Sequence, residues 1–209
     1  KWFDHYCLHF NTLELNVTYY KFPRVEFLKR WFDRSPDKFT FTVKAPRHIT
    51  HFKKFQDAAQ MLSDFNGTAK EGLGKKLGCV LFQFPSNFKY DPERLGRITE
   101  TLDTSLRNVL EFRHESWWNA GVFDEMAKAK VIFCGMSHPK LPEKVIGTTD
   151  TLYYRFHGVP HLYSSGYETR KLEEVVQRII NCGGQDAFIY FNNTADANAI
   201  TNAKQIQEI

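Results

Sequence analysis

Short apolar runs alternate with longer amphipathic stretches along the whole chain. The runs have the length of strands, are rich in Val, Ile, Phe, Tyr and Leu, and are bounded by Pro, Gly or polar residues. They predict seven strands, at residues 8–16, 39–44, 77–84, 107–112, 131–136, 151–157 and 187–192.

The stretches between these runs predict helices. The clearest stretch has apolar residues at i, i+3, i+4, i+7 and i+8, namely Leu172, Val175, Val176, Ile179 and Ile180. It stops before Gly183, a residue type that commonly ends helices. Another helix is expected to begin with Asp91 as N-cap and Pro92 at its first position. Further helices are expected at residues 24–33, 55–65, 116–129 and 196–208, and residues 1–6 are expected to end one.

Strands separated by helices cannot be joined by tight hairpins, so they must lie parallel with right-handed crossovers. This leaves a TIM (β/α)8-type barrel or an open, doubly wound sheet. Seven units of about 30 residues fall one short of the eight-unit barrel. We therefore expect an α/β barrel whose first β/α unit is absent or not included in this chain. The open sheet needs no missing unit, but it predicts a Gly-rich dinucleotide-binding turn, which we do not find.

The composition is that of an ordinary globular protein, so residues 1–209 are expected to form a single domain. Hydrophobic residues make up 42% of the chain and charged residues 25%. The net charge of +4 is too small to establish nucleic-acid binding by itself. No apolar run is long enough for a membrane helix. The four cysteines are scattered, without a C-x-x-C pair, which favours a reducing compartment and a cytoplasmic protein.

Polar residues gather where the predicted strands end, and in either architecture that edge binds ligands. Period-two spacing puts Glu14 beside Asn16, Glu111 beside Arg113, Arg155 beside His157 and Tyr190 beside Asn192. Further candidates at strand ends or just after them are Lys44, Gln83, His114 and Asn193. These groups could satisfy one another, as buried charges do. So many charges and amides at one rim favour a functional pocket, because core packing alone would avoid their desolvation.

A basic loop follows the second predicted strand. Residues 44–54 contain four fixed cations and two histidines, one of them His51, and no acid. Such a loop is either a site for an anion or an ordinary solvated surface. Aromatic residues follow two of the later predicted strands. Trp117 follows the strand that ends near Glu111, and Tyr163 and Tyr167 lie in the loop after His157. These rings could stack on a sugar or a base.

A catalytic metal is not favoured, although its presence stays open. Candidate ligands are Glu14, His51, Glu111, His114 and His157. His51 has a short-range histidine neighbour in His48, but this pair lies on a loop. The cofactor is therefore left unknown.

Several long segments, in the same order, resemble the YecE-like family, also called domain of unknown function 72. They include residues 10–23, 41–44, 49–51, 77–85, 111–117, 154–158, 190–193 and 202–203. The resemblance implies a TIM barrel and an upstream first strand that this chain does not include. It supplies no settled reaction. Related barrels of endonuclease and sugar-isomerase type suggest nucleic-acid or sugar-phosphate ligands by analogy of fold.

Our leading hypothesis is an enzyme, a hydrolase or isomerase, that acts on an anionic substrate such as a sugar phosphate or a nucleic-acid fragment. Lys44, Arg113 and Arg155 would hold the anion. Glu111 would be the general base, His157 the acid and Glu14 a second carboxylate. The hydroxyl groups of the substrate would be oriented by Asn16, Gln83, Tyr190 and Asn192.

Two alternatives stay open. The first is a non-catalytic protein that binds nucleic acid through the loop at residues 44–54 and the rim aromatics, with an affinity that falls steeply with salt. The second is an interaction scaffold whose rim groups pair with one another. No membrane association is expected, and protein partners are unknown.

Overall fold

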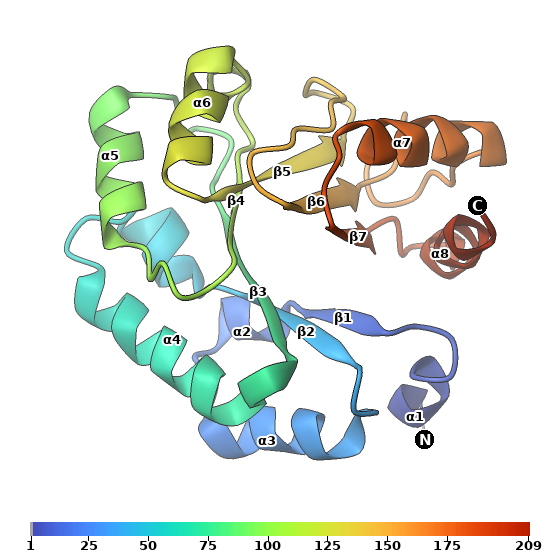
Figure 1. Cartoon of the computed structure of the whole chain (residues 1–209), viewed down its shortest axis with the longest axis horizontal. Coiled ribbons are helices and arrows are strands. Elements are labelled where there is room, and N and C mark those ends of the chain that lie inside the picture. The colour runs from blue at the N-terminus through green and yellow to red at the C-terminus, as the bar shows by residue number, and fades with distance from the viewer. Residues whose placement is uncertain (1) are drawn as a thin grey trace. The chain divides into compact units, whose positions relative to one another are not determined.

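The computed structural model describes residues 2–209, which form two compact units (Figure 1). The first unit contains the chain up to Pro85 together with Tyr90–Leu110, and the second contains Ser86–Lys89 and Glu111–Ile209. The fourth strand ends at the boundary, so Glu111 is the first residue of the larger part of the second unit.

Seven strands alternate with helices in both units. The strands are β1 (Thr12–Leu15), β2 (Thr40–Lys44), β3 (Leu77–Gln83), β4 (Asn108–Glu111), β5 (Ile132–Ser137), β6 (Thr151–Phe156) and β7 (Asp186–Phe191). The α-helices are α1 (Trp2–Tyr6), α2 (Val17–Tyr20), α3 (Val25–Arg34), α4 (Ala59–Leu73), α5 (Pro92–Thr101), α6 (Ala120–Lys128), α7 (Thr169–Asn181) and α8 (Asn198–Glu208). A π-helical turn covers His48–Phe52, and 3₁₀ turns cover Gly74–Lys76 and Glu115–Trp117.

The strands follow one another in chain order, β1 to β7. In the first unit β1, β2 and β3 are parallel, with Glu14 opposite Thr42. In the second unit β5, β6 and β7 are parallel, with Arg155 opposite Met136 and Tyr190. A doubly wound sheet reverses its strand order at a switch point, and this sheet does not. The predicted α/β barrel class is therefore confirmed, and the open-sheet alternative is excluded.

All seven predicted strands are present, and two of the larger differences in element boundaries, one at a strand and one at a helix, have clear physical causes. The first strand begins only at Thr12, because residues before it form α1 and the turn that follows. The helix expected from Phe55 begins at Ala59, because Lys54, Phe55 and Asp57 have positive φ angles, which no helix tolerates. The N-cap prediction at Asp91 is confirmed, since its carboxylate accepts from the backbone N–H groups of the first helical turn.

A buried lysine ends helix α3 in the first unit. Lys76 is 3% exposed and its Nζ donates to the carbonyl oxygens of Phe32 and Ser35, at 2.7 and 2.8 Å, and to the Ser35 hydroxyl at 2.9 Å. The last carbonyls of a helix have no partner inside it, and the ammonium group supplies one. Burial lowers the pKa of Lys76, but the three acceptors and the Phe32 ring, 4.5 Å away, compensate the charge.

Replacing Lys76 by Met should lower the free energy of unfolding by about 2 kcal/mol, because the carbonyls at the end of α3 lose their donor while staying buried. Urea denaturation measures this loss. The matched control is Lys75→Met, since Lys75 is largely exposed and makes only a long ion pair with Asp37. Equal losses in the two variants would show that the helix end does not depend on Lys76.

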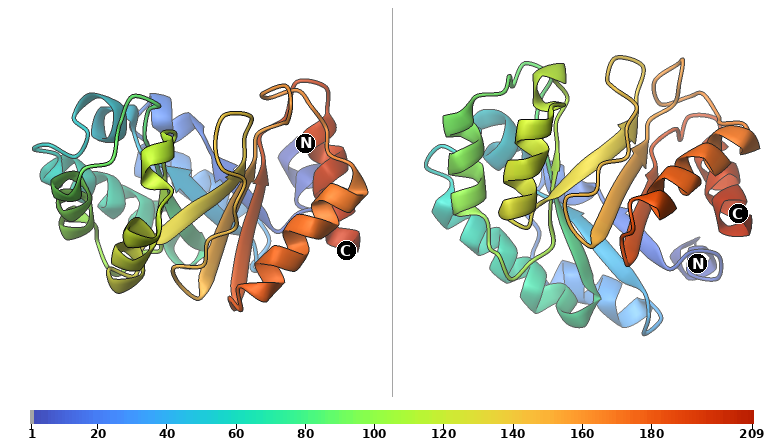
Figure 2. Two further views of the ribbon diagram at one scale, coloured as in Figure 1. Left: turned by 90° about the horizontal axis from the view of Figure 1, so that it is seen from above. Right: turned by 45° about the horizontal axis from the view of Figure 1, so that its top comes forward.

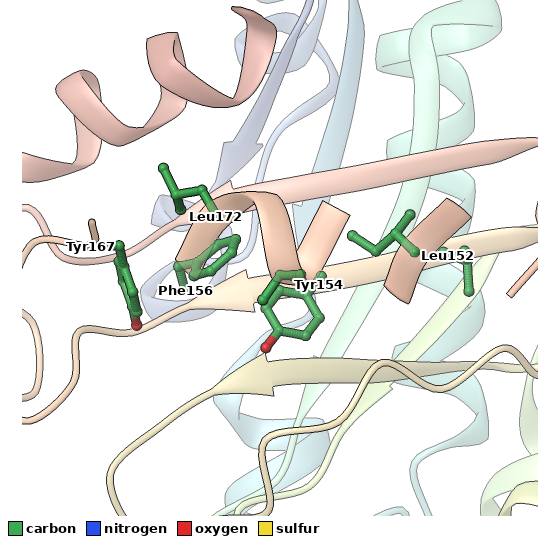
Figure 3. Close-up of a cluster of buried hydrophobic side chains, with 7 residues drawn as sticks. Leu152, Tyr154, Phe156, Tyr167 and Leu172 are labelled. Carbon is green, nitrogen blue, oxygen red and sulfur yellow. The ribbon is translucent and has the colours of Figure 1, made fainter. Parts of the chain in front are cut away.

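The core of the second unit lies between β6 and α7 (Figure 3). Leu152, Tyr154 and Phe156 project from one face of β6 and pack with Leu172 of α7 and with Tyr167. Figure 2 shows α7 beside β6 and β7 in both views. Because successive side chains of a strand point to opposite faces, the residues between them, Arg155 among them, face away from this helix.

Asparagines from β7 and α8 hold the loop that follows β6. Asn193 donates to the Ser165 carbonyl, and Asn202 binds both backbone groups of Tyr167. The Asn198 amide donates to the Ser164 carbonyl at 2.6 Å. Loops seldom lie this well ordered without such bonds, since their backbone groups have no ladder partner. These hydrogen bonds from asparagine side chains hold the loop at residues 158–168, which follows β6, in place.

Among residues 2–209, no helix is long and apolar enough to cross a membrane. All four cysteines carry free thiols; Cys79 and Cys134 are buried, and Cys182 is exposed.

Candidate functional site

Two neighbouring stretches of the second unit bring a charged cluster together. Glu111 ends β4 and Arg113 follows it two residues later, while Arg155 lies in β6 and His157 directly after it. Each pair has the period-two spacing that places both side chains on one face of a strand. On β6 this is the face opposite to the apolar residues that pack on α7, so the sequence predicted this juxtaposition.

The Glu111 carboxylate is shared between two guanidinium groups. Its Oε2 accepts from Arg155 Nη1 at 2.5 Å, and its Oε1 accepts from Arg113 Nε. Glu111 is fully buried and Arg155 is 1% exposed, whereas the Arg113 side chain retains 10% of its exposure. Charges this deeply buried persist only when they are paired, and here one carboxylate serves two cations.

His157 lies against this ion-pair cluster as a neutral imidazole. Arg113 Nη2 lies 3.1 Å from His157 Nε2, and the side-chain amide of Asn192 lies 3.3 Å from its Nδ1. A guanidinium group can only donate, so the ring must accept, which an imidazolium cannot do. Burial, reinforced by the positive charge of Arg155, lowers the pKa of His157 well below its usual value.

A second imidazole stands beside the first. His138 follows β5, is half-buried, and its ring centre lies 5.7 Å from that of His157, edge to face. Burial, followed in size by the charge of Arg113, lowers the pKa of His138 to about 4. Both rings are therefore neutral near pH 7, and each has one nitrogen that donates a hydrogen bond and one that accepts.

In this cluster one carboxylate lies between two guanidinium groups of the second unit. Glu111 contributes one negative charge, Arg113 and Arg155 contribute two positive charges, and both histidines are neutral. A guanidinium fork suits phosphate or carboxylate. The arrangement can thus bind an oxyanion next to two neutral imidazoles.

Other predicted residues of the second unit separate into rim and core. Tyr163 is 45% exposed, with its ring 6.3 Å from that of His157, so it lies where a rim aromatic was expected. Tyr167 instead belongs to the hydrophobic cluster, and its hydroxyl accepts from the backbone N–H of Gly158 at 2.8 Å. Asn193 is fully buried in the loop-holding network. Tyr190 is 8% exposed and packs on Tyr153, with ring centres 5.3 Å apart.

Trp117 packs against other side chains, and His114 caps a turn. Trp117 is fully buried, stacks on Phe112 with ring centres 3.8 Å apart, and donates its indole N–H to the Phe88 carbonyl. The prediction that Trp117 stacks on a ligand therefore does not hold, because no face of the ring is open. His114 Nδ1 accepts from the Ser116 backbone N–H and caps the 3₁₀ turn at Glu115–Trp117.

The first unit holds a second polar cluster at the ends of β1, β2 and β3. Lys44 Nζ donates to the Gln83 side chain at 2.6 Å and lies 4.5 Å from the centre of the Tyr19 ring. The Asn16 amide donates to Glu14 at 3.0 Å, as their period-two spacing predicted. Thr18 donates to the Lys44 carbonyl and so ties α2 to β2.

The basic loop of the first unit is a π-helical turn with an aromatic on its surface. The Arg47 guanidinium lies 5.5 Å from the centre of the Phe52 ring, and Phe52 is 62% exposed. His51 is half-buried, accepts or donates at Nδ1 to the Thr50 hydroxyl at 2.9 Å, and meets the Tyr19 ring edge to face.

Among residues 2–209, no group of three or more His, Cys, Asp or Glu side chains is placed to hold a metal ion. The five candidate ligands of the sequence are distributed between the two units, with Glu14 and His51 in the first and Glu111, His114 and His157 in the second.

Two residues at these clusters were not among the predicted site residues. Tyr19 contacts both Lys44 and His51, and His138 contacts His157. Both come within a few residues after a strand, which is the same signal that selected the others. That position was available in the sequence, but nothing there distinguished these side chains from their neighbours.

Comparison with known proteins identifies the family of this chain. Residues 1–209 match the family described as "Protein of unknown function DUF72". The chain belongs to the DUF72 family. The UPF0759 protein YunF of Bacillus subtilis is 26% identical over 98% of this chain and 84% of its own length. The UPF0759 protein YecE of Escherichia coli is 28% identical over 56% of this chain and 43% of its own length.

Solved structures of DUF72 proteins have the same fold. The crystal structure of a DUF72 family protein from Thermotoga maritima matches with a TM-score of 0.85 and 25% identity, covering 95% of this chain and 84% of that one. A DUF72 family protein from Enterococcus faecalis matches with a TM-score of 0.87 and 20% identity, covering 98% and 86% of the two chains. These relatives carry the fold and the family, and their names state no reaction.

The Glu111→Gln variant should lose about 3–5 kcal/mol of unfolding free energy, because both buried guanidinium groups then lose the charge of the carboxylate that they share. Chemical denaturation measures the loss. The control is Glu115→Gln, since Glu115 is exposed and its replacement should change stability by no more than about 0.5 kcal/mol. A Glu111→Gln variant as stable as the control would mean that the ion-pair cluster contributes nothing to folding.

Stability should fall as the pH is lowered from about 6.5 to 4. The folded protein holds His138 with a pKa near 4, whereas the unfolded chain binds a proton near the usual value of 6.5, so acid favours unfolding. His138→Gln removes this contribution, and its unfolding free energy should decline less over that range than that of the unmodified protein. His161→Gln, at an exposed position, should keep the full decline. Parallel curves for all three proteins would contradict the assigned pKa of His138.

Proposed function

We propose that the cluster around Glu111 binds the anionic group of a small substrate, and that the neutral imidazoles beside it carry out acid/base chemistry. The substrate class is a phosphorylated sugar or a nucleic-acid fragment, and the reaction is a hydrolysis or an isomerisation. The observation that supports this most strongly is that Glu111 and His157 hold the Arg113 guanidinium in place, while its Nη1 group makes no hydrogen bond to residues 2–209.

Arg113 is the residue proposed to contact the anion. It is the member of the ion-pair cluster with measurable exposure, and its Nη1 group makes no hydrogen bond to the residues that the structure describes. Its Nε and Nη2 groups are engaged by Glu111 and His157, so the guanidinium plane is fixed before a substrate arrives. A preoriented donor binds an anion without losing side-chain freedom at that moment.

Glu111 binds Arg113 directly, and Arg155 in turn binds Glu111. Both oxygens of Glu111 accept from guanidinium groups, so this carboxylate is better suited to orienting Arg113 than to taking a proton from a substrate. The role of Glu111 as general base stays a prediction from the sequence. His157 is the proposed acid/base group, since it is neutral and touches Arg113 directly.

The first unit offers a second candidate function. Phe52 is exposed beside Arg47, and the adjoining residues Lys53 and Lys54 are basic, so this loop could bind nucleic acid by stacking and charge without catalysis. Lys44 contributes less to such a surface, because it is 8% exposed and engaged by Gln83 and Tyr19. The buried ion-pair cluster has no place in this function, and therefore the catalytic proposal accounts for more of the molecule.

The test compares Arg113→Gln with the unmodified protein in thermal-shift and calorimetric titrations against inorganic phosphate and a panel of phosphorylated sugars. A bound ligand raises the melting temperature by mass action. Loss of one charged contact should weaken binding by about tenfold or more in Arg113→Gln. Arg170→Gln is the control, because Arg170 is 88% exposed on α7 and only pairs with Glu174.

Turnover of a bound sugar phosphate should disappear in His157→Gln while phosphate binding persists. Equal binding by Arg113→Gln and Arg170→Gln would remove the proposed site. Salt-sensitive binding of single-stranded DNA that Arg113→Gln leaves unchanged, without turnover of any phosphorylated sugar, would favour the loop at residues 44–54 instead.

A further inference from the structure

His138 lies beside the charged cluster and makes none of its ion pairs. It follows β5, the strand that pairs with β6, and its ring touches that of His157 edge to face. His157 is fully buried, whereas His138 is half-buried. Of the two imidazoles, His138 is therefore the more accessible to solvent.

The backbone fixes which nitrogen of His138 carries the proton. The amide N–H of Lys140 donates to His138 Nδ1 at 3.1 Å. A ring nitrogen that accepts a hydrogen bond carries no proton, so the proton of the neutral ring lies on Nε2. In the part of the chain that the structure describes, Nε2 makes no hydrogen bond. His138 thus presents a single, oriented N–H donor.

Arg113 presents a comparable donor from the neighbouring strand. Its Nη1 group has no partner among residues 2–209, and its Nη2 group contacts the same His157 ring that His138 touches. Two unengaged donors therefore flank one buried imidazole. Hydrogen-bond donors that converge without an acceptor are the usual feature of an oxyanion site.

We propose that His138 is a substrate-contacting residue, which donates from Nε2 to an oxygen of the same anionic group that Arg113 binds. This inference rests on the proposed function and assigns it a second recognition residue. The ligand is an oxyanion, a phosphate ester or a carboxylate, with at least two oxygens to accept from the two donors. The contact needs a neutral ring with a fixed tautomer, rather than a second positive charge.

The surroundings of His138 keep it neutral. The charged or titratable groups facing it in the second unit are Glu111, Arg113, Lys140 and His157, and the two cations together with burial outweigh the carboxylate. The pKa near 4 agrees with this balance, so the donor on Nε2 is present throughout the physiological range.

The test uses two neutral replacements that imitate different ring nitrogens. A glutamine side chain can place an N–H near the position of Nε2, whereas asparagine reaches only the position of Nδ1. If His138 donates to the ligand, His138→Gln should keep the affinity within about threefold and His138→Asn should lose about tenfold, the effect of one hydrogen bond to a charged group. A merely structural role, accepting from Lys140, predicts the reverse order.

The probe is inorganic sulfate, measured by calorimetry at pH 7, because its charge does not change near neutral pH. Arg113→Gln and the exposed-site control His161→Asn are titrated in parallel, and circular dichroism confirms that each variant is folded. Weaker binding by His138→Asn than by His138→Gln supports the inference. Equal affinities in the two variants, or the reverse order, overturn it while leaving the anion site intact. If the unmodified protein does not bind sulfate, phosphate or any phosphorylated sugar, the proposed function itself fails.

Discussion

The ion-pair cluster depends on one buried carboxylate. Glu111 accepts from Arg155 on one oxygen and from Arg113 on the other, and neither it nor Arg155 has appreciable contact with solvent. Removing either partner of such a pair leaves an uncompensated charge in a medium that solvates it poorly. The Glu111 carboxylate therefore holds two side chains in place, Arg113 after β4 and Arg155 in β6. The orientation of Arg113 follows from it, whereas burial and the charge of Arg155 keep His157 neutral.

The fold provides this carboxylate with a rigid frame. Apolar residues of β6 pack on α7, and the alternation of the strand then leaves Arg155 and His157 on the opposite face. The loop after β6 is tied down by Asn193 and Asn202. Tyr167 links the two layers, since its ring lies in the hydrophobic cluster and its hydroxyl holds Gly158, the residue after His157. Groups held by packing and by backbone bonds are suited to binding a ligand with little rearrangement.

Much of this arrangement could be predicted from the sequence because it follows from periodicity. The seven strands, the Asp91 cap and the pairs Glu111 with Arg113 and Arg155 with His157 all rest on spacings of two or on helix-start signals. What could not be predicted was which polar residues meet a ligand and which meet the backbone. Tyr167 and Asn193 were predicted to contact a ligand, but their partners are main-chain groups of a loop whose path the sequence does not reveal. Likewise, nothing in the sequence shows that Trp117 is covered on both faces, or that positive φ angles delay α4 to Ala59.

The most direct measurement is a crystal structure of the protein grown with a saturating concentration of phosphate. The account predicts a tetrahedral anion within hydrogen-bonding distance of Arg113 Nη1, with Glu111 still accepting from both arginines. An anion bound only at the Lys44 cluster of the first unit, or a Glu111 side chain that contacts neither guanidinium group, would contradict it.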